Sequence, residues 1–229
     1  MTSEAICGRL DKITVDIRHC ERMAGHAEGS VQLIAVSKKK PVEMIRAALA
    51  CGQRCFGESY AQEFQEKVTA LANSGIEWHF IGPIQSNKTK LIAAHAHWVH
   101  SVDREKIARR LARQRPDSLP PLNICLQVNI DNEPAKAGVT LDELPALAQN
   151  IADIDNIRLR GLMCIPRRRD NAAAQRLPFA QLREAMADLN TGGFALDTLS
   201  MGMSGDYAAA IAEGATMIRI GTAIFGQRD

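Results

Sequence analysis

Short apolar runs alternate along this chain with segments in which apolar residues recur every three or four positions. In the first such unit, the run at residues 33–36 is followed by Val42, Ile45 and Leu49 at helical spacing, and Gly52 ends the helical pattern. A further amphipathic helix is predicted at residues 5–22. The alternation continues along the whole chain and predicts eight strands, at residues 33–36, 55–57, 77–81, 98–99, 122–128, 159–163, 198–201 and 217–220.

This alternation of strands and helices is typical of a parallel sheet with right-handed crossovers. The chain has 229 residues, which suits a closed barrel, since barrels of eight βα units need roughly 200 residues or more. An open doubly wound sheet would need a glycine-rich turn after the first strand, but residues 37–40 read Ser-Lys-Lys-Lys. We therefore predict an α/β fold, a single (β/α)8 TIM barrel over residues 1–229 with an extra N-terminal helix.

Composition narrows the function classes. The net charge is only +2, which gives no reason to expect a nucleic-acid partner. No apolar run approaches the roughly 20 residues that span a bilayer, so no membrane association is expected. The N-terminus reads as a helix and not as a secretory signal, which predicts a cytoplasmic protein. In that reducing compartment all six cysteines are expected to be free thiols; they are Cys7, Cys20, Cys51, Cys55, Cys125 and Cys164.

No metal site is predicted. Cys51 and Cys55 are spaced C-x3-C, but no second such pair accompanies them. His95, His97 and His100 are close in sequence but straddle a helix end and a strand, so they are not expected to share one face. We interpret these histidines as ordinary side chains, and His79, on a predicted strand, as a core histidine with its hydrogen bonds made.

Polar and small residues gather at the predicted carboxyl ends of the strands, where barrels of this kind carry their active sites. They follow or end the first, second, sixth, seventh and eighth strands. We take them as the candidate binding residues: Lys38, Ser59, Met163, Ser200, Ser204, Arg219, Gly221 and Thr222.

Lys38 comes directly after an apolar strand, so its side chain can point inward from the rim of the barrel. Partial burial of a lysine disfavours the ammonium form, and the neutral amine then attacks an aldehyde to give a Schiff base. Position alone leaves open a solvent-facing lysine, because Lys39 and Lys40 beside it are typical of surface charge.

The loops after the last two strands are where phosphate groups commonly bind in this fold. Gly221 allows the backbone N–H to approach an anion closely, and Thr222 and Ser204 each offer a hydroxyl. Residues from 222 onward predict a short helix, whose N-terminus favours an anion.

Together these segments resemble the pyridoxal 5′-phosphate (PLP) homeostasis protein family, also known as the proline synthetase co-transcribed homologue group. The likeness covers nearly the whole chain. The matching motifs are Ala35-Val36-Ser37-Lys38, Phe56-Gly57-Glu58-Ser59-Tyr60, Trp78-His79-Phe80-Ile81-Gly82-Pro83, Arg160-Gly161-Leu162-Met163, Leu199-Ser200-Met201-Gly202-Met203-Ser204 and Met217-Ile218-Arg219-Ile220-Gly221-Thr222.

The resemblance implies a fold like the barrel domain of bacterial alanine racemase, with PLP as the cofactor. It implies a Schiff base on Lys38, and Arg219 facing the pyridine nitrogen. It also implies that Ser204, Gly221 and Thr222 hold the phosphate. One position departs from the family, which usually has Asn where this chain has Ser59, so the shorter serine is expected to reach a ligand only through water.

The resemblance further implies a carrier or buffer of PLP, a monomer that supplies the cofactor to apo-enzymes without catalysing a reaction itself. An arginine can only donate hydrogen bonds, so Arg219 would leave the pyridine nitrogen neutral and weaken its capacity as an electron sink. In the racemases that this barrel resembles, a second domain is joined to the barrel and supplies a catalytic tyrosine. The tyrosines here are Tyr60 and Tyr207, both within the predicted barrel.

Two alternatives remain at this level. One is a low-activity PLP-dependent amino-acid racemase. The other is a regulatory module that binds a protein or RNA, supported locally by the basic run at Arg167, Arg168 and Arg169.

Overall fold

Eight parallel strands close into one barrel in the computed structural model, which describes residues 2–227. Each strand pairs with the next along the chain, and the last strand pairs with the first through partners such as Ile34 and Arg219. The predicted fold class is confirmed. The strands are β1 (Gln32–Val36), β2 (Cys55–Glu58), β3 (Glu77–Phe80), β4 (Trp98–Val102), β5 (Leu122–Val128), β6 (Ile157–Cys164), β7 (Thr198–Ser200) and β8 (Met217–Ile220).

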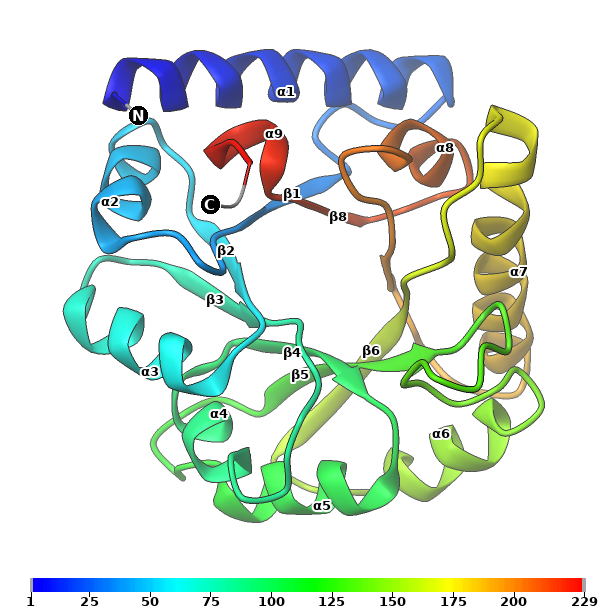
Figure 1. Cartoon of the computed structure of the whole chain (residues 1–229). Helices are drawn as coiled ribbons and strands as arrows, with labels where there is room; N and C mark the ends of the chain where they lie inside the picture. The colour runs from blue at the N-terminus through cyan, green and yellow to red at the C-terminus, as the bar shows by residue number, and fades with distance from the viewer. Residues whose placement is uncertain (1, 228–229) are drawn as a thin grey trace.

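The helices form a ring outside the barrel (Figure 1). The extra N-terminal helix, α1, lies across the outside of this ring beside α2, α8 and α9, and buries one apolar face that includes Ile6, Leu10 and Ile13. The helices are α1 (Ser3–Met23), α2 (Val42–Ala50), α3 (Ala61–Ala70), α4 (Thr89–His95), α5 (Glu105–Gln114), α6 (Leu144–Ala152), α7 (Ala172–Thr191), α8 (Tyr207–Ala212) and α9 (Thr222–Phe225).

The barrel interior is filled by side chains from different strands. Successive residues of a strand point to opposite faces, so every second residue points inward. One buried apolar cluster joins side chains of β1, β4, β5, β6 and β8 and is separate from the larger core between the strands and the helices. It consists of Ile34, Trp98, Cys125, Met163 and Met217. Met163 therefore lies inside the barrel.

Some predicted boundaries were wrong. β4 runs to Val102, whereas the prediction ended at residue 99, because the buried polar residues His100 and Ser101 interrupt its apolar pattern. α6 begins at Leu144, so Leu141 of the predicted helical stripe precedes the helix.

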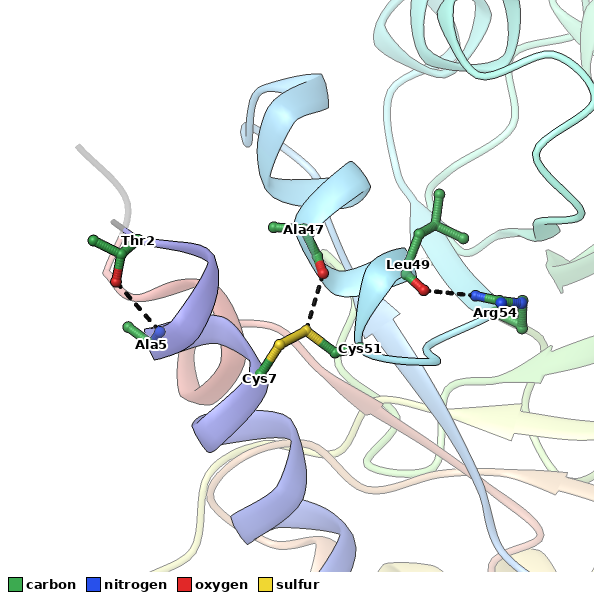
Figure 2. The surroundings of a disulfide bond; sticks show 7 residues. All are labelled: Thr2, Ala5, Cys7, Ala47, Leu49, Cys51 and Arg54. Carbon is green, nitrogen blue, oxygen red and sulfur yellow. Dashed lines mark hydrogen bonds between the residues drawn. A yellow bond between two sulfur atoms is a disulfide. The ribbon is translucent and has the colours of Figure 1, made fainter.

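The prediction that all six cysteines are free is wrong for two of them. Cys7 of α1 and Cys51, at the end of α2, form a disulfide with their Cα atoms 5.4 Å apart (Figure 2). The docking of α1 onto α2 brings together two residues that are 44 positions apart. The spacing of the cysteines along the sequence does not predict this contact. The other four cysteines are free.

Within the described residues, no helix has the length and apolar character needed to cross a membrane.

Candidate functional site

A cavity of about 250 Å³ opens at the carboxyl ends of the strands. Six of the eight candidate binding residues line it, and the other two, Met163 and Ser200, do not. The predicted residues in its wall are Lys38, Ser59, Ser204, Arg219, Gly221 and Thr222. They are joined by residues that the sequence did not single out as ligand contacts: Val36, Ile81, Ile165, Met203 and Gly205.

The turn that carries Lys38 is held by a buried ion pair. Lys67 of α3 contacts Glu58 of β2 at 2.7 Å, and both side chains are almost wholly buried. The Lys67 ammonium also donates to the backbone carbonyl of Ser37 at 2.7 Å, and the Ser37 hydroxyl donates to Glu58 at 2.6 Å. Residue 37 is thus anchored through both its backbone and its side chain.

The residue on the other side of Lys38 is fixed as well. Lys39 adopts a left-handed backbone conformation with φ of 60°, and its backbone N–H donates to Glu63 at 2.5 Å. The same carboxylate contacts Lys67. Because both neighbours of Lys38 are held, its half-buried side chain leaves from a defined point at the edge of the cavity.

Two glycines shape the backbone around the cavity. Gly202 has φ of +94°, and a Cβ there would lie 2.7 Å from Ala210, so the turn after β7 requires glycine. A Cβ on Gly221 would lie only 3.0 Å from the carbonyl oxygen of Val36. The absence of a side chain at this position therefore allows the start of α9 to lie against β1. Asp206 accepts the backbone N–H of Met203 at 2.6 Å and so holds the loop that carries Ser204.

Arg219 is a buried cation beside the cavity. Its guanidinium donates to the hydroxyl of Ser200 at 2.7 Å and to the backbone carbonyl of Cys164 at 2.9 Å. Among residues 2–227, no carboxylate lies within 4.0 Å of it, and burial lowers the pKa of this guanidinium. An arginine has five N–H donors, so donors remain for a ligand in the cavity that Arg219 lines.

A chain of buried polar side chains continues from Arg219 through the barrel. Ser200 Oγ lies 2.7 Å from His100 Nδ1, and His100 Nε2 lies 2.9 Å from His79 Nδ1. His79 Nε2 in turn lies 2.9 Å from a carboxylate oxygen of Glu77 at the start of β3. Burial lowers the pKa of His79 and takes that of His100 well below its usual value, so both rings are neutral.

The direction of these hydrogen bonds follows from Arg219, which can only donate. The oxygen of the Ser200 hydroxyl accepts a hydrogen bond from Arg219. The Ser200 proton is then donated to His100 Nδ1, the acceptor that lies within hydrogen-bond distance in the described part of the chain. We therefore assign the proton of His100 to Nε2, facing Nδ1 of His79, and the proton of His79 to Nε2, which lies beside Glu77 without making a hydrogen bond of acceptable geometry. The contact with His79 lowers the pKa of Glu77.

The sequence interpretation of these histidines was incomplete. His79 is buried, as predicted, but the prediction that its hydrogen bonds are made is wrong for Nε2, which has no hydrogen-bond partner among the described residues. The interpretation of His100 as an ordinary side chain missed its contacts with His79 on β3 and Ser200 on β7. One signal was present, because His79 lies between two large apolar residues on β3 and His100 directly follows Trp98 and Val99 on β4.

The basic run borders a second cavity, of about 490 Å³, which shares Met203, Ser204 and Gly205 with the first. Asp131 pairs with Arg169 and also contacts Arg167 at 3.6 Å. A third cavity, of about 500 Å³, lies between α6 and α7, away from the strand ends.

Comparison with known proteins identifies the class to which this barrel belongs. The family model described as "Alanine racemase, N-terminal domain" matches residues 10–229. Alanine racemase from Corynebacterium glutamicum has the same fold, with a TM-score of 0.70 at 16% identity, over 98% of this chain and 61% of that one.

Closer relatives define the family. The chain is 55% identical over 224 residues to the pyridoxal phosphate homeostasis protein of Pseudomonas aeruginosa, covering 98% of this chain and 96% of that protein. It is 48% identical over 222 residues to the protein of that name from Escherichia coli, covering 96% and 93%. The chain belongs to the pyridoxal phosphate homeostasis protein family.

A solved structure supports the same grouping. PipY of Synechococcus elongatus, determined with PLP bound, is 38% identical to this chain and has a TM-score of 0.84, over 96% of this chain and all of PipY.

Proposed function

We propose that this protein binds PLP in the cavity at the carboxyl ends of the strands and acts in intracellular PLP homeostasis as a carrier. The observation that carries the proposal is the lining of one cavity, in which a lysine, three hydroxyl side chains and a glycine accompany a buried arginine. This set suits an aldehyde, a phosphate and an aromatic ring nitrogen. The PLP-bound relative PipY and the names of the curated relatives support the same ligand.

In this proposal the Lys38 amine condenses with the PLP aldehyde, forming an imine and releasing water. Ser204, Gly221 and Thr222 bind the phosphate through hydroxyl and backbone donors, and Arg219 donates to the pyridine nitrogen. Ser59 faces the same cavity and contacts the ligand through water.

The Arg219 environment favours storage over catalysis. PLP accelerates amino-acid chemistry as an electron sink, and a protonated pyridine nitrogen deepens that sink. Arg219 has no carboxylate within 4.0 Å among the described residues, so the groups beside the cavity offer this nitrogen a donor and not an acceptor. We infer that cofactor delivery to apo-enzymes, with the protein acting as a monomer in the cytoplasm, fits these features better than turnover.

Reduction with borohydride followed by peptide mapping tests the ligand and its attachment together. Protein incubated with PLP should carry one pyridoxyl group on the peptide containing Lys38. Lys38→Ala should lose the visible Schiff-base absorbance, while the neighbouring variant Lys39→Ala should keep it. A pyridoxyl group on another lysine would reject the assignment.

Two functional assays separate carrier from racemase. The loaded protein should restore activity to a PLP-free enzyme, and it should turn over a panel of L-amino acids no faster than free PLP does. Turnover well above that of free PLP would favour the racemase instead.

A further inference from the structure

Three side chains with metal-ligand chemistry meet at the amino-terminal mouth of the barrel, the end opposite the proposed PLP cavity. The Sγ of Cys55, a carboxylate oxygen of Glu77 and Nε2 of His79 all lie within 4.8 Å of one another. Cys55 and Glu77 are register partners on β2 and β3, and His79 follows Glu77 by two residues on the same face of β3. The closed barrel itself therefore holds the three groups together.

One of these atoms is a buried nitrogen without a satisfactory partner. His79 is completely buried, and its Nδ1 is bonded to His100. Its Nε2 lies 2.9 Å from Glu77, but neither Glu77 nor any other described acceptor is oriented to form a hydrogen bond with it. A buried polar atom in this condition requires an explanation, and an ion bound beside it is one.

The spacing and chemistry of the group fit zinc. Tetrahedral zinc with bonds of roughly 2.0–2.3 Å separates its nitrogen, oxygen and sulfur ligands by roughly 3.3–3.6 Å. The His79–Glu77 separation of 2.9 Å and the Cys55–Glu77 separation of 4.0 Å lie on either side of that range. Thiolate and imidazole ligands suit zinc, whereas magnesium and calcium prefer oxygen alone.

A fourth polar group and an entry route are also present. The side-chain amide of Gln32, at the start of β1, lies 3.0 Å from Cys55 Sγ and 3.3 Å from Glu77. Turning that amide over would present its oxygen in place of its nitrogen. The Glu77 side chain is 37% exposed, so the group can be reached from solvent.

We propose that Cys55, Glu77 and His79 form a binding site for one zinc-class divalent cation, completed by Gln32 or water. On binding, the Cys55 thiol releases its proton to water as the sulfur–metal bond forms. His79 uses its Nε2 lone pair, so its proton moves to Nδ1.

That move has a consequence at the other end of the barrel. With its proton on Nδ1, His79 becomes the donor to His100, and the proton of His100 moves to the nitrogen facing Ser200. Ser200 then accepts from both His100 and Arg219, and its own hydroxyl proton no longer has His100 as its acceptor. The cation site does not depend on the proposed PLP function, but this coupling to Arg219 does.

Equilibrium dialysis of the purified full-length protein against zinc, with the metal content measured by elemental analysis, tests the site. Wild-type protein without PLP should bind one equivalent. Cys55→Ser should bind at least tenfold more weakly, and the matched control Cys20→Ser, at a half-buried free thiol on α1, should bind as the wild type does. Equal binding by Cys55→Ser, or less than a tenth of an equivalent in the wild type, would overturn the site.

Cobalt gives a second measurement that does not rely on comparing the folding of variants. Cobalt bound to the wild type should show sulfur-to-metal charge transfer and visible bands typical of tetrahedral coordination, and their absence would count against the ligand set. In PLP-loaded protein, zinc should shift the cofactor absorbance in the wild type and not in Cys55→Ser. Stoichiometric zinc without that shift would reject the coupling alone.

Discussion

Ser200 Oγ accepts a hydrogen bond of 2.7 Å from the guanidinium of Arg219. Sequence position placed both residues at the proposed ligand, but only Arg219 lines the cavity. Ser200 lies behind it and, together with the carbonyl of Cys164, orients the guanidinium. Ser200 therefore acts through Arg219 in the structure, as a positioning residue.

Arg219→Glu should allow the pyridine nitrogen of bound PLP to become protonated. A carboxylate can accept a hydrogen bond from the protonated nitrogen, whereas arginine can only donate one. The ¹⁵N chemical shift of labelled PLP on the protein reports this directly. Arg219→Gln, which has no charge, is the control. An unprotonated nitrogen in Arg219→Glu would show that this residue does not face the ring nitrogen. Both variants should also lose about 1–3 kcal/mol of stability, because Ser200 and the Cys164 carbonyl lose their donor.

Ser204→Ala and Thr222→Ala should each weaken PLP retention by about 1–3 kcal/mol, roughly a 5- to 150-fold rise in Kd, because each removes a charge-assisted hydrogen bond to phosphate. Fluorescence titration with PLP measures the change. Thr69→Ala, at an exposed site on α3 away from the cavity, is a control. Wild-type affinity in either test variant would move the phosphate elsewhere.

Stability should fall as the pH drops below about 6.5. His79 and His100 have lowered pKa values in the folded protein, so between those values and 6.5 the unfolded chain binds more protons than the folded one. Each such imidazole should lower the free energy of unfolding by about 1.4 kcal/mol for every pH unit below 6.5 within that window. Above pH 6.5 its contribution to stability is fully present. Carboxylates with lowered pKa values act at lower pH, because their ordinary values are 3.8 and 4.5.

Urea unfolding at a series of pH values between 5 and 7.5 measures this slope. His100→Gln removes one titrating group, so its slope should be shallower by about 1.4 kcal/mol per pH unit, although its stability at pH 7.5 is lower. Parallel slopes for wild type and His100→Gln would show that His100 does not resist protonation in the folded state.

Loss of the Cys7–Cys51 disulfide should lower the free energy of unfolding by about 2–4 kcal/mol, because the bond restrains the unfolded chain over 44 residues. The corresponding fall in Tm is roughly 4–16 °C at this chain length. Cys7→Ser tests it by calorimetry without reductant, with Cys20→Ser as the matched control. Reductant should bring the wild type to the Tm of Cys7→Ser, and a Tm that reductant leaves unchanged would mean that the bond is absent in solution.

Local patterns predicted much of this protein. The alternation of apolar runs with helical spacing gave the number, order and approximate position of the strands, because burial on both faces of a barrel strand is visible in a few consecutive residues. Position at a strand end made Lys38, Ser204 and Thr222 candidates, since all parallel strands deliver their carboxyl ends to the same rim. The family resemblance was needed to choose Lys38 over a solvent-facing lysine. The chemical identity of the ligand came from the family resemblance.

Contacts across the barrel were decided by tertiary structure alone. His79, His100 and Ser200 belong to three strands, and their hydrogen bonds depend on strand register and on the inward direction of each side chain. The Cys7–Cys51 bond depends in the same way on how α1 docks onto α2. A sequence records which residues are available for such contacts, but the distance between two side chains far apart along the chain is determined only when the barrel closes.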